Sequence, residues 1–187
     1  LNRSARAWGR RHDLAAVINA GMYAQDLTTH TGYFHTGDHV NNPVWNRRDY
    51  RQAACFEPRE PGFPRFVLQD LDAAPESTFV HLYDVVVQNL RLIRHPGENR
   101  WSPQTNEWAE ACLAEDREGR ALWIHCATQH DMHTFNEILL ELPLDVVAAQ
   151  HLEGGAVAQL WVDPALLEHD EDGALGGLPM PVPNVLG

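Results

Sequence analysis

The stretch that decides the fold is residues 150–162, Gln150-His151-Leu152-Glu153-Gly154-Gly155-Ala156-Val157-Ala158-Gln159-Leu160-Trp161-Val162. Apolar segments at residues 146–149 and 160–162 flank a pair of glycines and predict two short buried strands. These strands meet at Glu153-Gly154-Gly155, where glycine backbone reaches conformations that other residues avoid. Taken alone, the stretch is typical of a tight turn with a solvated carboxylate. The competing interpretation is functional, because binding and catalytic residues often gather on loops at strand ends.

Length and charge limit the classes of protein that the chain can represent. Its 187 residues predict a single domain over residues 1–187. The net charge of −12 argues against nucleic acid or an anionic membrane as the main partner, because both need a broad basic face. No apolar run approaches the roughly 20 residues that span a bilayer. Cys55, Cys112 and Cys126 show no CxxC spacing, so we expect buried free thiols and at most one disulfide.

No signal peptide is visible in residues 1–11, because they lack an apolar h-region. The chain begins at Leu1 rather than Met, and we therefore expect a processed or trimmed N-terminus.

Hydrophobic patterning predicts many strands and few helices. Strands are expected at residues 14–18, 32–35, 52–56, 66–69, 78–89, 108–114, 121–126 and 146–149. Ser4 caps an expected short helix at residues 4–11, and the main helix is expected at about residues 131–142, with Asp131 as its cap. Most of residues 24–64 and 96–106 are expected to be loop, residues 121–152 a strand–helix–strand crossover, and residues 181–185 an extended tail. The fold class is therefore α+β around a largely antiparallel or mixed sheet.

Polar side chains stand at the ends of several expected strands. They are Asn19, Gln88, Asn89, Glu110, Asp116 and Glu153, with Arg91 and Arg100 nearby. Amides and guanidinium groups supply donors in fixed directions, which suits sugar hydroxyls and phosphate oxygens. A carboxylate pair is what glycoside hydrolysis needs, one as general acid and one as base or nucleophile. If the strand ends converge, these residues predict one pocket for a sugar or a sugar phosphate.

Histidine supplies an alternative chemistry. Two groups stand out, His30, His35 and His39 in one and His125, His130 and His133 in the other. Neither matches a helical HExxH or a knuckle with CxxC, so a divalent metal on the second group, with or without Glu153, is the weaker hypothesis. His125 and Cys126 do not predict a nucleophilic thiol, because neighbours along a strand point to opposite faces.

Three motifs resemble those of phosphodiester glycosidase domains. Residues 17–23, Val17-Ile18-Asn19-Ala20-Gly21-Met22-Tyr23, resemble the family's INAGM[FY] signature near the start of the domain. Residues 152–160 resemble its C-terminal LDGGGSAQL, and residues 116–120 resemble its D-x-x-GR hairpin. The motifs occur in the family's order and the likeness covers about residues 5–187, essentially the whole chain.

The resemblance implies hydrolysis of a sugar 1-phosphodiester in an extracytoplasmic compartment. By analogy the cavity is lined by Asn19, Gly21, Gln88 and Glu153, and the expected substrate-binding set also includes Asn89, Arg91, Arg100, Gly154 and Gly155. Three positions depart from the family pattern: Glu153 replaces Asp, Val157 replaces Ser, and Glu110 replaces an Arg. A carboxylate in place of that Arg would repel a phosphodiester.

Three hypotheses follow. The first is a divergent phosphodiester glycosidase with Glu153 as acid/base and Glu110 or Asp116 as second carboxylate. The second is a glycan- or cell-wall-binding module that kept the pocket and lost catalysis. The third is a metal-dependent hydrolase, and outside it we expect no cofactor.

Overall fold

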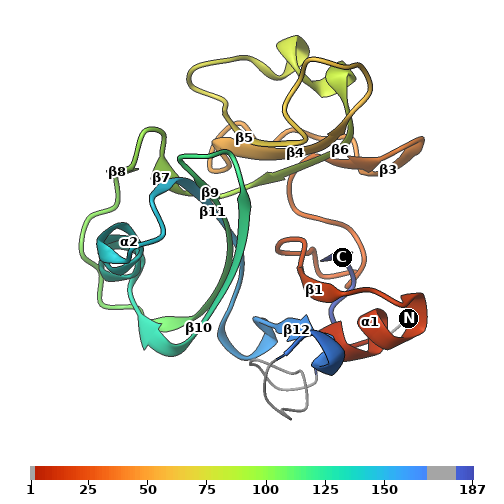
Figure 1. Ribbon diagram of the computed structural model, residues 1–187. Helices are drawn as coiled ribbons and strands as arrows, with labels where there is room; N and C mark the ends of the chain where they lie inside the picture. The colour runs from red at the N-terminus through yellow and green to blue at the C-terminus, as the bar shows by residue number, and fades with distance from the viewer. Residues whose placement is uncertain (1–2, 168–179) are drawn as a thin grey trace.

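The computed structural model describes residues 3–167 and 180–187, in which the strands form three sheets (Figure 1). The first sheet has the order β3-β2-β6-β4-β5, with β2 Phe34–Thr36, β3 His39–Asn42, β4 Gln52–Pro58, β5 Phe66–Asp70 and β6 Tyr83–Asn89. The second has the order β10-β9-β11-β7-β8, with β7 Arg91–Arg94, β8 Glu98–Asn99, β9 Trp108–Asp116, β10 Ala121–His130 and β11 Val146–Gly154. The third has the order β12-β1-β13, with β1 Ala16–Asn19, β12 Leu160–Val162 and β13 Val185–Leu186.

The neighbouring strands pair antiparallel in all three sheets, which confirms the expected α+β class. β10 and β11 both run antiparallel to β9, so they are parallel to each other. The helix α2, Met132–Glu141, connects them, and the strand–helix–strand crossover is therefore present as predicted. Short 3-10 turns complete the described elements: η1 Glu76–Thr78, η2 Val80–Leu82, η3 Gly155–Val157 and η4 Pro164–Leu166.

Both expected helices begin at the expected caps. Ser4 accepts a hydrogen bond from the Ala7 amide at the start of α1, Ala5–His12. The Asp131 carboxylate accepts from the His133 and Thr134 amides at the start of α2. The side chains of Met132, Phe135 and Leu139 pack α2 onto the second sheet. These contacts bury one face of the helix, as its sequence period predicts.

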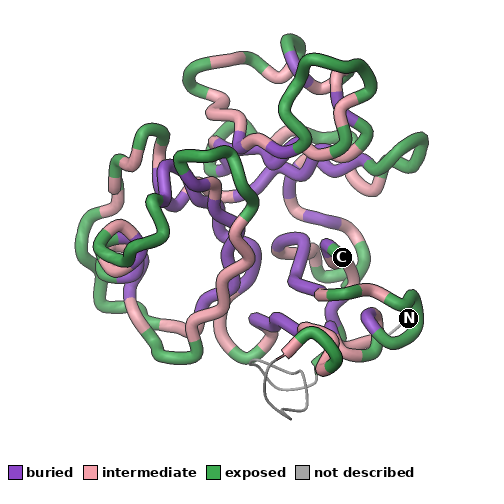
Figure 2. The backbone as a smooth tube through the Cα atoms, in the orientation of Figure 1, coloured by how far each residue is buried: buried purple, intermediate pink, exposed green. Residues whose placement is uncertain are grey.

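The main core lies between the three sheets. It includes Ile18 from β1, Ala54 from β4, Leu113 from β9 and Leu152 from β11, all fully buried. In Figure 2 the buried backbone follows these strands, and the exposed backbone is concentrated in the connecting loops. Burial of this shared cluster holds the sheets together through the hydrophobic effect.

A single extended run joins the first and second sheets. β6 ends at Asn89 and β7 begins at Arg91, so that only Leu90 separates them. The Leu90 carbonyl accepts a hydrogen bond of 2.9 Å from the His151 amide of β11. The end of β6 therefore lies beside β11, close to the point where β11 reaches Glu153.

The structure corrects several expected boundaries. β11 continues to Gly154 and then enters η3, and β12 pairs with β1 in another sheet, so the glycines do not form a tight turn between paired strands. β3 and β7 were not expected, the strand predicted at residues 14–18 begins at Ala16, and β10 extends to His130. The three cysteines are free, as predicted, although Cys126 is only half-buried. Among the described helices, none is both long and apolar enough to cross a membrane. The expected tail at residues 181–185 ends in β13, beside β1.

Candidate functional site

Glu153 lies at a β-bulge near the end of β11. His151 pairs with Cys112 of β9 and Glu153 with Ala111, so Leu152 is an extra residue on the β11 side. Strict alternation would direct Glu153 to the same face as His151, and the bulge changes that direction. Burial raises the pKa of the Tyr23 and Tyr50 phenols, and the nearby Glu153 carboxylate adds to both shifts.

The environment of Glu153 favours its protonated form. Its side chain is buried, and the residue is only 9% exposed. Oε1 accepts a hydrogen bond of 3.1 Å from the Gly154 amide, whereas Oε2 has no hydrogen-bond partner among the described residues. Burial raises the pKa of Glu153, against the lowering effects of the Gly154 amide and His151. A carboxyl group with a raised pKa and one available oxygen has the properties of a general acid.

His151 and Glu110 form a buried pair beside Glu153. Nδ1 of His151 lies 2.5 Å from Oε1 of Glu110, and the two side chains are 5% and 3% exposed. The indole Nε1 of Trp108 donates to the other oxygen of Glu110 at 2.9 Å. Although burial would lower the pKa of His151, the Glu110 carboxylate raises it. Both oxygens of Glu110 are therefore occupied, and the imidazole of His151 is oriented by a carboxylate.

His151 was not predicted as a site residue. It belongs to the deciding stretch and stands two residues before Glu153, but its importance depends on the register of β11 against β9. Glu110 and Cys112 share a face of β9, and His151 lies opposite Cys112, which brings the imidazole to Glu110. The signal in the sequence was thus a histidine and a glutamate on adjacent strands.

Gly154 permits the contact between Trp108 and Glu110. A Cβ at Gly154 would lie 2.8 Å from Cδ1 of Trp108 and 3.1 Å from its Nε1. Any larger side chain would therefore push the indole away. Gly155 follows with φ of 69°, a left-handed conformation that favours glycine and starts the η3 turn.

Asn19 fixes the segment that follows Glu153. Its Nδ2 donates to the Val157 carbonyl at 3.0 Å, and its Oδ1 accepts from the Gln159 amide at 2.7 Å. The side chain therefore ties the end of β1 to the end of η3. Asn19 is 1% exposed, and its amide is committed to this backbone.

Asn89 ties the end of β6 to the segment after β1. Its Nδ2 donates to the Ala20 carbonyl at 2.9 Å, whereas its buried Oδ1 has no partner in the described structure. Gly21 passes so close that a Cβ would lie 2.3 Å from this Oδ1 and from Cε1 of His30. We call the region of Asn19, Gly21, Asn89, Glu110, His151 and Glu153, where ends of β1, β6, β9 and β11 meet, the polar junction.

Gln88 faces away from the polar junction. Its Oε1 accepts from the Tyr33 and Asn46 amides, and its Nε2 donates to the carbonyls of Asn46 and Tyr50, all at 2.8–3.0 Å. These four hydrogen bonds saturate the side-chain amide. Gln88 holds the loop before β4, and it is not brought together with Glu153.

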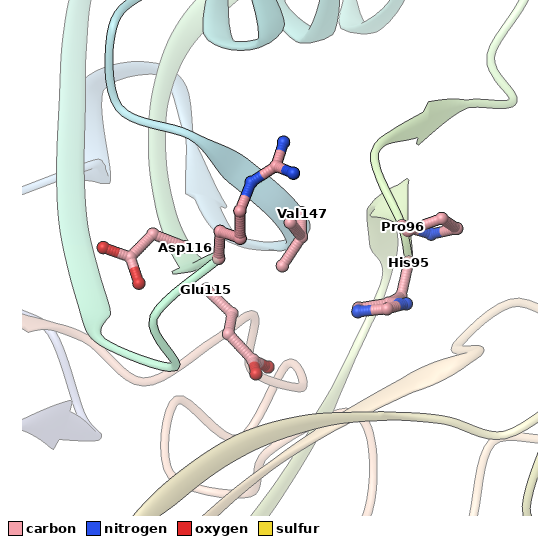
Figure 3. A pocket seen from close by; sticks show the side chains of 6 residues that line it. His95, Pro96, Glu115, Asp116 and Val147 are labelled. Carbon is pink, nitrogen blue, oxygen red and sulfur yellow. The ribbon is translucent and has the colours of Figure 1, made fainter.

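Asp116 lies at the other end of β9 from Glu110. They are six residue steps apart along the strand, which is about 20 Å. The Asp116 carboxylate accepts from Nε of Arg120 at 2.6 Å and from the Glu118 amide, and so it closes the hairpin. There it borders a cavity of 220 Å³ that is also lined by Glu115 and His95 (Figure 3). The two carboxylates expected as alternatives therefore occupy separate places.

The expected arginines are also engaged outside the polar junction. Arg91 contacts Asp70 at 2.7 Å and Asp72 at 2.9 Å. Arg100 is half-exposed and contacts Glu98 at 3.3 Å. Neither guanidinium group is brought to Glu153.

The histidines expected for a metal do not form a described metal centre. Nδ1 of His133 lies 2.7 Å from the Trp101 carbonyl, so His133 fastens α2 to the preceding loop. His125 and His130 belong to β10. Across residues 3–167 and 180–187, no group of three or more His, Cys, Asp or Glu side chains is arranged to hold a metal ion.

Comparisons with known proteins place these observations in context. The family model described as "Phosphodiester glycosidase" matches residues 12–187. The zebrafish N-acetylglucosamine-1-phosphodiester α-N-acetylglucosaminidase catalytic domain, auto-inhibited by its pro-peptide, is structurally similar with a TM-score of 0.67 at 13% identity. That match covers 99% of this chain and 66% of the zebrafish chain.

A hypothetical protein from Synechocystis is similar with a TM-score of 0.52 at 12% identity, over 87% of this chain and 50% of that chain. At these identities both likenesses show the fold alone. A search of curated protein sequences finds no match.

Proposed function

Because the chain belongs to the phosphodiester glycosidase family, we propose that it hydrolyses a bond to the anomeric carbon of a sugar, in a sugar 1-phosphodiester or a related glycoside. The observation that carries the proposal is Glu153, a buried carboxyl group with one unpartnered oxygen beside an oriented imidazole. Family membership supports the glycosidase-type reaction, and the residues of the polar junction supply the acid and the base that such a reaction needs.

In the proposed reaction Glu153 is the general acid. Burial raises its pKa, which favours the protonated form that this role requires, and Oε2 donates the proton to the leaving oxygen as the bond to the anomeric carbon breaks. Water attacks the anomeric carbon, and Nε2 of His151 accepts its proton. Glu110 orients the imidazole through Nδ1 and stabilises the imidazolium that forms. One proton thus enters the leaving group and one leaves the attacking water.

The test replaces Glu153 by Gln, which keeps the size and removes the titratable group. The name of the similar zebrafish domain gives an N-acetylglucosamine 1-phosphodiester as its substrate. Substrates of that sugar are therefore tried first. We expect kcat of Glu153→Gln to fall by about 100-fold or more while the fold is retained.

A matched control is Glu115→Gln, since Glu115 is another partly buried carboxyl group with a raised pKa but lies at the far end of β9. It should keep nearly full activity. Full activity in Glu153→Gln would refute the assignment of Glu153.

Binding without catalysis is the second candidate function. It is favoured by Glu110, because both of its oxygens are engaged and only one carboxyl group of the polar junction has an available oxygen. Saturable sugar binding without turnover on a panel of nitrophenyl glycosides and sugar phosphodiesters would select this function.

A further inference from the structure

We propose that the polar junction takes a glycoside whose leaving group is uncharged, in preference to the phosphodiester of the same sugar. The inference rests on the proposed function, because it assumes that the sugar binds at Glu153. It is carried by the charges of the polar junction and by two acceptor oxygens there that have no hydrogen-bond partner among the described residues.

The titratable side chains of the polar junction carry no net positive charge at neutral pH. Nδ1 of His151 and Oε1 of Glu110 share one proton across their 2.5 Å contact, and with Nε2 unprotonated, as the proposed reaction requires, the pair carries a charge of −1. Glu153 adds a charge of zero when protonated and −1 when ionised. A buried phosphodiester needs a cation or several donors to offset the loss of its hydration. The pair provides no excess cation, and an ionised Glu153 would repel the phosphate.

The residues expected to contact phosphate are committed elsewhere. All 14 basic residues other than histidine are arginines. Arg91 is held by Asp70 and Asp72, and Arg100 by Glu98. Nδ2 of Asn19 and Nδ2 of Asn89 each donate one hydrogen bond to a backbone carbonyl, which leaves at most one N–H on each amide for a ligand.

Two acceptor oxygens of the polar junction lack hydrogen-bond partners among the described residues. Oδ1 of Asn89 is buried beside Gly21 without a donor, and Oε2 of Glu153 has no hydrogen-bond partner in the described part of the chain. Such acceptors complement hydroxyl groups, which donate, and they do not complement phosphate oxygens, which only accept. The polar junction is therefore suited to a hydroxyl-rich neutral ligand.

The experiment compares two uncleavable ligands of one sugar on the complete wild-type chain. The neutral ligand is the methyl C-glycoside, and the anionic ligand is the C-linked phosphonate monomethyl ester. Titration calorimetry should give a Kd at least about 10-fold lower for the neutral ligand, since one desolvated charge near a carboxylate costs on the order of 1.4 kcal/mol or more.

A variant of Glu110 then removes one negative charge from the polar junction. Glu110→Gln leaves His151 without its carboxylate, and we expect the ratio of the two Kd values to move at least about 10-fold toward the anionic ligand. Glu115→Gln, outside the polar junction, should leave the ratio unchanged. Because the wild-type comparison is decisive alone, the inference is tested even if Glu110→Gln does not fold.

The outcomes separate the two proposals. Tighter wild-type binding of the phosphonate overturns the inference and leaves the proposed hydrolysis intact. Tighter binding of the neutral ligand without turnover of any glycoside supports the inference and overturns catalysis. Binding of neither ligand overturns both.

Discussion

At the scale of single residues, Glu153 couples stability to pH. Burial raises the pKa of Glu153 in the folded chain above that of an unfolded carboxyl group. The folded protein therefore holds this proton more tightly, and the corresponding stabilisation is complete below the unfolded pKa and lost as pH rises through the folded pKa.

The variant Glu153→Gln should not show this loss of stability at high pH. Gln is neutral at every pH, so we expect the variant to be more stable than the wild type above the folded pKa, by about 1.4 kcal/mol per unit of pKa shift. Urea unfolding at pH 4 and pH 8 measures the difference. If the difference in unfolding free energy between variant and wild type were the same at both pH values, Glu153 would not have a raised pKa in the folded chain.

Trp108 is the second residue whose replacement has a defined cost. Trp108→Phe removes the donor to Oε2 of Glu110 and leaves a buried carboxylate oxygen unpaired. We expect a loss of about 1–3 kcal/mol in the free energy of unfolding. Trp45→Phe is the control, because Trp45 stacks on Tyr33 and its Nε1 makes no hydrogen bond within the described residues. Equal losses in both variants would show that indole packing, and not the hydrogen bond, is responsible.

At the scale of elements, the Trp108 indole of β9 packs against Gly154 at the end of β11. Gly154→Ala places a methyl group 2.8 Å from Cδ1 of Trp108, and overpacking of this kind costs about 1–3 kcal/mol. Gly155→Asn is the matched control, because a Cβ there meets nothing within 4 Å and Asn tolerates positive φ. Chemical denaturation should therefore show a larger loss for Gly154→Ala, and the reverse order would disprove the packing argument.

The same elements show what the sequence could and could not predict. The helices were found because their caps and apolar periods are local signals. β7 was missed because Arg91-Leu92-Ile93-Arg94 is short and charged at both ends, and it is a strand only by pairing with β11 and β8.

The site was harder to predict, because it depends on register. Asp116 and Glu110 were both polar residues near strand ends, but they stand at opposite ends of β9. The pairing of His151 with Glu110 and the bulge at Leu152 require the alignment of β9 with β11, which no local pattern contains. The family resemblance found by motif was confirmed by the match over residues 12–187.

At the scale of the whole molecule, an ion-pair network joins the first two sheets. Asp70 of β5 accepts from Arg91 and Arg94 of β7 at 2.7 and 2.9 Å, and its side chain is only 9% exposed. These charge-assisted hydrogen bonds cross from one sheet to the other. They therefore connect β5 of the first sheet to β7 of the second.

Asp70→Asn should weaken this connection. Loss of the charge leaves two partly buried guanidinium groups with a weaker acceptor. We therefore expect the free energy of unfolding to fall by about 1.5–3 kcal/mol. Glu57→Gln is the control, because its contact with Arg65 is solvent-exposed, and such pairs contribute at most about 1 kcal/mol. Unfolding by urea at low and high salt measures both, and equal effects would exclude a structural role for the network.

The continuous run from β6 through Leu90 into β7 has a consequence for how the molecule can come apart. The seven-residue β6 belongs to the first sheet and the four-residue β7 to the second, with only Leu90 between them, so we expect the two sheets to unfold together. The chain should therefore resist division into two halves. A permuted chain opened at Leu90 would lose both sheets in one cooperative event, whereas one opened at the tip of the β9–β10 hairpin would keep them.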